Sequence, residues 1–372
     1  MPWSLVAIAV ALMVFGWLGI ARSEEFREEL AGHGSRYVHQ QMLFSLLAAA
    51  AMFVVSIPNY RMLCRYSYLL LMLSLALLVA VYFFPPINHA RRWIRLGPVG
   101  VQPSEFAKVA FVLALARYLM YRENYRRLRG LVIPLALAML PVLLILKEPD
   151  LGTSMVFLPV LLVLLFAAGA RRADLAKVAL LGLLALPLLW TQMSREQKLR
   201  VTALFEQPPA AQRPSDNAYH LHQAKRMLAL GGFWGSLLAG QPTDDPTAYR
   251  LPEARSDFIF CVLGERLGLF GVAIVLGLFT LLVWRGLVIA TATREPFGRL
   301  VAIGVTALIA VQVLINTGMT VGLLPITGLS LPLISYGGSG LLAHGIALGL
   351  LLNIGSRPGY EVTKEPFRYN VE

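Results

Sequence analysis

The chain has 372 residues, of which 57% are hydrophobic and only 15% are charged, and its mean hydropathy is +0.65. This composition excludes an ordinary soluble domain and predicts an integral membrane protein that crosses the bilayer several times. The formal net charge of +12 fits a membrane protein attracted to anionic lipid, so it is no argument for nucleic acid binding.

Ten apolar stretches follow one another along the chain, each near the length of a membrane-spanning helix. They are 3–20, 41–57, 66–84, 106–121, 131–146, 153–169, 175–191, 258–284, 300–320 and 340–354. The first lacks a preceding basic residue and a following cleavage pattern, which indicates a retained helix. We therefore expect an all-α polytopic membrane protein, one domain over residues 1–372, with about ten transmembrane helices. A large extracytoplasmic loop, 192–256, would join the seventh and eighth.

Arginine and lysine near the ends of the spans set the expected orientation, because these residues are retained on the cytoplasmic side. With both termini inside, the inner loops hold sixteen of them: Arg61, Arg65, Arg117, Arg122, Arg126, Arg127, Arg129, Arg171, Arg172, Lys177, Arg285, Arg294, Arg299, Arg357, Lys364 and Arg368. The short outer loops hold seven: Arg22, Arg27, Arg36, Arg91, Arg92, Arg95 and Lys147. Both termini are therefore predicted to be cytoplasmic.

Five polar clusters fall at the outer ends of the predicted helices, and the first is basic. Arg91, Arg92 and Arg95, with Trp93 among them, oppose the inside preference of positive charge. Two interpretations are open: the three arginines hold an anion, or they contact lipid headgroups at the interface.

The second cluster resembles the start of a helix. Gln102 precedes a proline that suits the first helical turn, Ser104 follows it, and Glu105 lies near the positive end of the helix dipole. Lys108 is predicted one turn inside the membrane on the same face as Glu105. Because an intramembrane lysine is costly, we expect the two to pair, either in a functional cavity or as a structural ion pair.

Two further clusters contain acidic residues at helix starts. Glu148 and Asp150 flank a proline between two spans, where Asp150 is a candidate helix cap and both are candidate site residues. Asp257, preceded by Arg255 and Ser256, stands between the large loop and the eighth span. It is either a helix cap or a reactive carboxylate at the membrane boundary.

The fifth cluster precedes the last span and consists of small and hydroxyl-bearing residues: Ser335, Tyr336, Gly337, Gly338 and Ser339. Its glycines would allow the backbone to approach a ligand closely, and its N–H groups could bind phosphate oxygens. Before it, the segment 217–240 is either an amphipathic helix on the outer interface or an ordinary loop helix packed on the bundle.

The order of these motifs resembles the SEDS family of bacterial cell-wall proteins (shape, elongation, division and sporulation). The residues that carry the resemblance are Arg91-Arg92-Trp93, Gln102-Pro103-Ser104-Glu105, Glu148-Pro149-Asp150, Asp257-Phe258-Ile259-Phe260, Gly322 to Gly328, and Ser335-Tyr336-Gly337-Gly338-Ser339. A very short N-terminal segment and the lack of a long tail make the chain most similar to the elongation member, although the division member shares nearly all these motifs.

The resemblance implies a peptidoglycan glycosyltransferase that polymerises lipid II at the outer face of the bacterial cytoplasmic membrane, for elongation and rod shape. It also implies a class B penicillin-binding protein, a transpeptidase, as partner. The family's catalytic aspartate corresponds to Asp257, although Arg255 and Ser256 stand where many relatives have a His-Thr-type run.

The residues fit that chemistry. A carboxylate at Asp257 could remove the proton from the acceptor hydroxyl, and a pyrophosphate leaving group needs cations nearby. The candidate cations are Arg91, Arg92, Arg95, Lys108 and Arg255, in a pocket that a divalent cation could share. Two other functions stay open: a lipid II flippase, whose path intramembrane charges and helix-breaking prolines would line, and a scaffold that recruits a cell-wall synthase.

Overall fold

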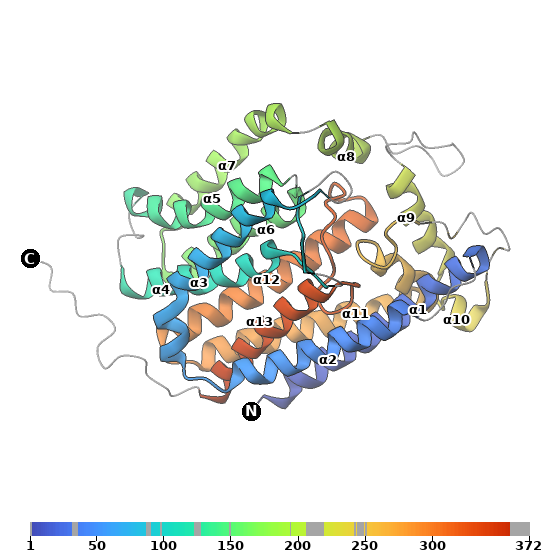
Figure 1. The fold of residues 1–372 in the computed structure, drawn as a ribbon, viewed down its shortest axis with the longest axis horizontal. Coiled ribbons are helices and arrows are strands. Elements are labelled where there is room, and N and C mark those ends of the chain that lie inside the picture. Colours follow the sequence, from blue (N-terminus) through green and yellow to red (C-terminus); the bar gives the residue numbers. More distant parts are fainter. Residues whose placement is uncertain are drawn as a thin grey trace, which may run out of the picture.

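A computed structural model of the chain is a bundle of long helices (Figure 1). It describes residues 2–31, 36–86, 91–96, 99–122, 128–148, 150–193, 195–205, 219–241, 243, 249 and 251–357. The α-helices are α1 (Trp3–Ala31), α2 (Arg36–Ser56), α3 (Tyr60–Ala80), α4 (Pro103–Tyr121), α5 (Val132–Lys147), α6 (Leu151–Ala168), α7 (Arg172–Gln192), α8 (Arg195–Phe205), α9 (Tyr219–Leu230), α10 (Ser236–Ala239), α11 (Ile259–Ala292), α12 (Pro296–Val321) and α13 (Gly338–Ser356). Two 3-10 helices are η1 (Val81–Phe83) and η3 (Leu128–Leu131).

The ten predicted spans correspond in order to α1 to α7 and α11 to α13, which confirms the polytopic all-α fold. Eight helices of the described part are long and apolar enough to cross a membrane by length and composition. Helices α4 and α7 are not among these eight, and α4 carries Glu105, Lys108 and Arg117. Most of α4 is buried among other helices, so its charged groups face protein.

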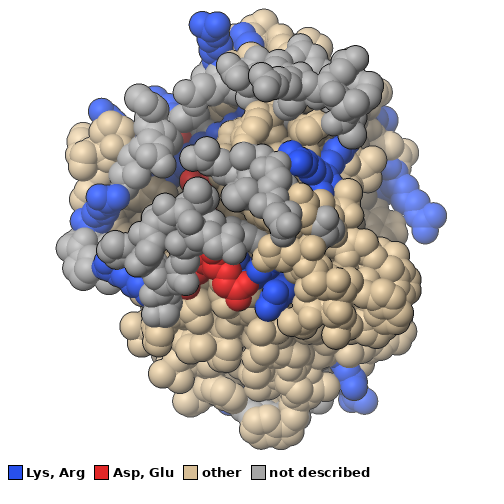
Figure 2. All heavy atoms as spheres, turned by 90° about the vertical axis from the view of Figure 1, so that its right-hand side faces the viewer, with Lys and Arg blue, Asp and Glu red and all other residues tan. Residues whose placement is uncertain are grey.

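The described part of the chain begins and ends at the same end of the molecule, where Pro2 lies against Gly355 (Figure 1). Helices α4, α6, α11 and α13 begin at the other end, which we call the polar end. Figure 2 views the molecule from this side, with acidic side chains near the centre and basic ones around them. An even number of crossings, as the ten spans predict, returns the chain to the end where it started.

Helix α12 lies at the centre of the bundle and packs against α4, α6, α11 and α13. Small residues permit these close approaches. A β-carbon on Gly304 would lie 2.5 Å from Val112 of α4, and one on Gly286 of α11 would lie 2.1 Å from Thr306 of α12. Helix α13 packs along α2, and α3 packs along α4. The core that supports the polar end is therefore formed by closely packed helices.

A short antiparallel hairpin, absent from our sequence-based prediction, precedes α4. Strand β1 (Ile94–Leu96) pairs with β2 (Val99–Val101), with Ile94 opposite Val101. The Oγ of Ser339 in α13 donates to the carbonyl oxygen of Gly100 at 3.0 Å. The hairpin therefore joins the start of α4 to the start of α13.

Helix α11 is broken at Gly268, where the sequence predicted one continuous span. Gly268 has φ 67° and ψ −168°, a backbone conformation that favours glycine. The N–H groups of Leu269 and Phe270 donate to the carbonyl oxygens of Gly232 and Phe233, at 3.0 and 3.3 Å. The segment after α9 thus satisfies backbone groups that the break frees, as a membrane environment requires.

We expect Gly268→Ala to lower the free energy of unfolding by about 1–3 kcal/mol from backbone strain alone. The added β-carbon would also lie 2.4 Å from the backbone nitrogen of Gly235 and the oxygen of Phe233. Gly277→Ala in the same helix is the matched control, because a β-carbon there has no neighbour within 4 Å. Thermal unfolding of the purified variants measures both; equal melting temperatures would contradict this account of the break.

Two details of the sequence interpretation change. Arg22, placed in a short loop, lies on α1, which extends well beyond the predicted span. Its Nε and Nη2 donate to the two oxygens of Glu265 at 3.1 and 2.9 Å, in a buried pair between α1 and α11.

Helix α9 packs against α11 and α12, so this part of segment 217–240 is a loop helix on the bundle. Within that loop, residues 206–218 and 244–248 lie outside the described part.

Candidate functional site

The starts of three helices meet at the polar end through direct hydrogen bonds. The backbone N–H of Gln102, the N-cap residue of α4, donates to the Oγ of Ser339 in α13 at 3.1 Å. The Gln102 side-chain amide donates to Asp150, at the start of α6, at 3.3 Å. Three of the five clusters that the sequence singled out therefore lie together.

The turn that carries Asp257 lies against the segment that precedes α13. Tyr336 donates its backbone N–H to the carbonyl oxygen of Arg255 at 2.9 Å, and the Ser335 Oγ donates to that of Ser256 at 2.5 Å. Asn316 of α12 donates through its amide to the carbonyl oxygens of Asp257 and Leu329, at 2.9 and 2.7 Å. The backbone on both sides of the Asp257 carboxylate is thus fixed by α12.

The Asp257 side chain is half-buried and does not cap α11, whose N-cap residue is Phe258. The pKa of Asp257 is raised to about 6, mainly by burial and also by the nearby Glu253 carboxylate, while Arg200 opposes the shift. A β-carbon on Gly328 would lie 3.3 Å from the Asp257 Oδ2 and 3.7 Å from an Nη of Arg200. The structure thus places a carboxylate of increased basicity next to an arginine.

Arg255 lies between two tyrosine rings. Its guanidinium carbon is 3.9 Å from the ring centroid of Tyr37 in α2 and 5.5 Å from that of Tyr336. The Tyr336 hydroxyl in turn donates to Gln40 of α2 at 2.7 Å. One buried nitrogen of Arg255 has no hydrogen-bond partner. The rings therefore hold a guanidinium that keeps a free donor beside the Asp257 turn.

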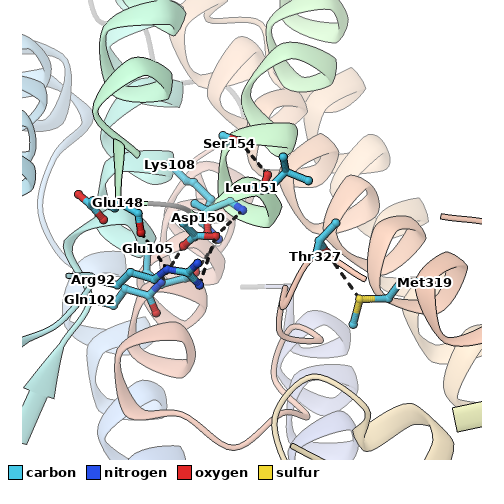
Figure 3. Close-up of polar contacts among 11 residues, drawn as sticks. Arg92, Gln102, Glu105, Lys108, Glu148, Asp150, Leu151, Ser154, Met319 and Thr327 are labelled. Atoms are coloured by element: carbon cyan, nitrogen blue, oxygen red, sulfur yellow. Dashed lines mark hydrogen bonds and ion pairs between the residues drawn. The ribbon is translucent and has the colours of Figure 1, made fainter. Parts of the chain in front are cut away.

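Arg92, Gln102 and Asp150 form a second group, shown in Figure 3. The Arg92 Nε donates to the carbonyl oxygen of Glu148 at 3.2 Å, and its Nη1 is 4.0 Å from Asp150. Asp150 accepts the backbone N–H of Thr153 at 3.1 Å, which confirms its predicted role as a cap. Both Glu148 carboxyl oxygens are buried without a partner, and burial raises the pKa of Glu148 to about 8, with Asp150 adding to the shift.

Glu105 and Lys108 form the predicted ion pair inside the bundle, at 2.9 Å (Figure 3). Both are almost completely buried, and the second Glu105 oxygen has no partner, like the hydroxyl of the neighbouring Ser104. His344 of α13 contacts Gln312 of α12 at 2.9 Å and lies near Glu105. Lys108 is therefore neutralised by Glu105 inside the bundle.

The arginine trio does not converge on one point. The exposed Arg91 donates to the carbonyl oxygen of Tyr82 at 2.6 Å, Arg92 belongs to the Asp150 group, and Arg95 is an exposed residue of β1. Trp93 packs on Gly100 across the hairpin. The prediction that the trio acts together as one anion-binding group therefore has no support in their arrangement.

The glycine cluster before α13 is well defined. Gly337 is the N-cap residue of α13 and donates its N–H to Gln41 at 3.4 Å, and Gly338 lies against the Phe44 ring. The Gln41 amide also donates to the carbonyl oxygen of Ser335 at 3.1 Å. Helix α2 thus sets the position of this turn beside Arg255.

Sequence reasoning missed Arg200 and Asn316 around Asp257, and it used Gly328 only for the family resemblance and not as a site residue. Arg200 on α8 comes from the large loop, where nothing in the pattern singled it out. Asn316 is a buried amide in an apolar span, and Gly328 has φ 72° directly beside the carboxylate. The polar residue within a span was the available signal for Asn316, because such residues are rare in membrane helices.

A divalent cation stays a prediction. Among the described residues, no three His, Cys, Asp or Glu side chains gather as a protein-only metal site requires. Magnesium held together with substrate phosphates needs only one or two carboxylates.

Comparison with known proteins gives a consistent family. Residues 2–358 match the family model FTSW_RODA_SPOVE, described as "Cell cycle protein". The chain is 34% identical over 358 residues to the probable peptidoglycan glycosyltransferase FtsW of Trichlorobacter lovleyi, covering 94% of this chain and 92% of that protein. It is 33% identical over 359 residues to the stage V sporulation protein E of Bacillus subtilis, covering 94% and 95%.

Two solved structures share the fold. One is a chain from a structure entitled "Structural coordination of polymerization and crosslinking by a peptidoglycan synthase complex", with a TM-score of 0.79, 30% identity and coverage of 96% of this chain and 98% of that one. The other is the rod shape determining protein RodA of Thermus thermophilus, with a TM-score of 0.71, 28% identity and coverage of 96% and 97%. The chain therefore belongs to the family of FtsW, RodA and SpoVE, the SEDS family of peptidoglycan glycosyltransferases.

Proposed function

We propose that the chain polymerises lipid II into glycan strands, with Asp257 as general base. The observation that carries this proposal is the basic carboxylate of Asp257 beside Arg200, in a turn that α12 and the segment before α13 hold rigidly. A base with a pKa near the working pH is the form that general base catalysis favours. The names of the relatives supply the reaction class.

In this reaction the acceptor sugar's 4-hydroxyl oxygen attacks the anomeric carbon of the donor. The new β-1,4 carbon–oxygen bond forms as the bond from that carbon to the undecaprenyl pyrophosphate breaks. The hydroxyl proton passes to the Asp257 carboxylate, and the pyrophosphate leaves with the bonding electron pair. No covalent enzyme intermediate is needed, because the single displacement inverts the anomeric carbon.

The departing pyrophosphate gains negative charge, which fixed cations stabilise. Arg200 and Arg255 are the best placed, since Arg200 is exposed beside Asp257 and Arg255 keeps a free donor near the same turn. Lys108 and Arg92 lie beside carboxylates, Glu105 and Asp150, so we assign them a positioning role. A bound divalent cation would add positive charge at the pyrophosphate.

Location and partners complete the proposal. The arginine and lysine count supports a cytoplasmic location for both termini, with the polar end at the outside of the bacterial cytoplasmic membrane. A class B penicillin-binding protein is the proposed partner, supported by the similarity to a chain of a peptidoglycan synthase complex. We also propose a role in elongation, which rescue of cells depleted of the elongation enzyme, but not of the division enzyme, would support.

Purified chain and purified lipid II test the activity directly, with and without a transpeptidase partner and a divalent cation. We expect glycan strands of many disaccharides from the wild type. No strands under any of these conditions would contradict the proposal, and a liposome scrambling assay would then test the flippase alternative.

We expect Arg200→Met to lower the polymerisation rate by about 100-fold, the effect typical of removing one charge-stabilising donor. Because Arg200 lowers the pKa of Asp257, its loss should also move the low-pH limb of the rate profile to higher pH. Arg195→Met is the matched control, an exposed arginine of the same helix. Equal rates for the two variants would rule Arg200 out of the site.

A further inference from the structure

A short segment beside the break in α11 presents apolar side chains outward. Phe233, Trp234, Leu237 and Leu238 are 53–73% exposed, and Leu269 and Phe270, just beyond the break, are 59% and 57% exposed. We call these six residues the wedge. Phe233 and Phe270 are joined directly, since the Phe270 N–H donates to the Phe233 carbonyl oxygen at 3.3 Å. The wedge is therefore one continuous surface from two parts of the chain.

The opposite side of the same segment is fixed to the protein. Ser236 of α10 is buried, and its Oγ accepts a hydrogen bond from Arg22 at 3.3 Å. Gly231 and Gly235 touch the backbone of α11 so closely that a β-carbon on either would lie 1.9 or 2.4 Å from it. The segment cannot rotate to bury the wedge without losing these contacts.

The wedge adjoins the part of α11 that is long and apolar enough to cross a membrane. The part of α11 from Leu269 to Ala292 is about 36 Å long at about 1.5 Å per residue. A hydrocarbon core is about 30 Å thick, so Leu269 and Phe270 lie near its edge when this part of α11 crosses it. Phe233 and Trp234 then lie at the depth of the headgroups, where aromatic residues are enriched in membrane proteins.

We propose that the wedge inserts into the bilayer interface at the polar end, with phospholipid as its occupant. Phe233, Trp234, Leu237 and Leu238 would bury their side chains at the boundary between headgroups and acyl chains, as interfacial helices do. In water the same cluster would be an exposed apolar patch of the kind that soluble surfaces avoid. The contact would hold the segment that caps the break in α11. This break lies nine residues after the start of the helix at Ile259. The inference does not depend on the glycosyltransferase activity.

Nitroxide labels test the depth of the wedge in nanodiscs of phosphatidylethanolamine and phosphatidylglycerol. A label at Leu238→Cys should collide readily with oxygen and rarely with a water-soluble nickel chelate. The two native cysteines, Cys64 and Cys261, are buried and should not react. The lipid-side control is Leu281→Cys, an exposed residue of α11, and the water-side control is Glu25→Cys, on the Arg22 side of the segment.

We expect the Leu238 label to match the Leu281 label and to collide with the chelate several-fold less than the Glu25 label. Adding Phe233→Ser and Trp234→Ser should raise its chelate collisions toward the Glu25 value. Chelate collisions at Leu238 equal to those at Glu25 in the wild-type background would overturn the proposal. Protection that arises only when a transpeptidase partner is added would also overturn it, because the surface would then bind protein.

Discussion

Asp257→Asn is expected to reduce lipid II polymerisation by about 100- to 10,000-fold, the range typical of losing a general base. The amide cannot accept the acceptor hydroxyl proton. It nearly matches the carboxylate in size, and the contacts that position residue 257 use its backbone carbonyl and N–H. We expect the variant to be inserted and folded like the wild type, so the loss should appear in turnover and not in yield.

Glu253→Gln is the matched control for this substitution. Glu253 lies on the same turn, is exposed, and acts on Asp257 only through its charge and the turn's backbone. We expect this variant to keep most of its activity near neutral pH. Turnover by Asp257→Asn within a few-fold of the wild type would eliminate the base assignment, whatever the control does.

Glu105→Ala is expected to be the most destabilising single substitution in the bundle, at about 3–5 kcal/mol, because it leaves the Lys108 ammonium buried without its counter-charge. Lys108 is 2% exposed, and its ion-pair partner among the described residues is Glu105. Thermal unfolding of the detergent-solubilised chain measures the effect.

The double variant Glu105→Ala/Lys108→Met separates a stranded charge from a lost contact. Removing both charges should recover a large part of the decrease in melting temperature, since an apolar pair of similar volume is often as stable as a buried ion pair. A double variant no more stable than Glu105→Ala alone would mean that the cost comes from the cavity and not from the charge.

The number and order of the long helices could be predicted, because the length of each apolar stretch determines whether it forms one. Ten stretches became ten helices in order, and the helix cap at Asp150 and the pair Glu105–Lys108 follow from local spacing. The break at Gly268 was not predictable, because a glycine in an apolar run is common and only the close packing of Phe233 and Gly235 against Gly268 distinguishes this one. The strands β1 and β2 are too short for the alternating pattern of apolar and polar residues typical of a strand to be recognised.

The site residues at the starts of helices could be predicted, but the site residue from the large loop could not. Asp257, Arg255 and the turn at Ser335 stand next to spans, so topology alone brings them to one end. Arg200 reaches Asp257 from the large loop, whose path no apolar periodicity specifies. For the arginine trio the sequence left anion binding and lipid contact open, and in the structure Arg91 and Arg92 donate to different backbone carbonyls.

The pH dependence of lipid II polymerisation tests the assignment of Asp257 as base most directly. A base must be ionised to act, so the rate should fall as pH drops through the Asp257 pKa of about 6, and not through the ordinary carboxyl range. Because Glu253 raises this pKa, Glu253→Gln should move the limb to lower pH, opposite to Arg200→Met. Two results would contradict the account. One is a rate that is constant from pH 5 to pH 7, and the other is a low-pH fall in rate whose midpoint neither variant shifts.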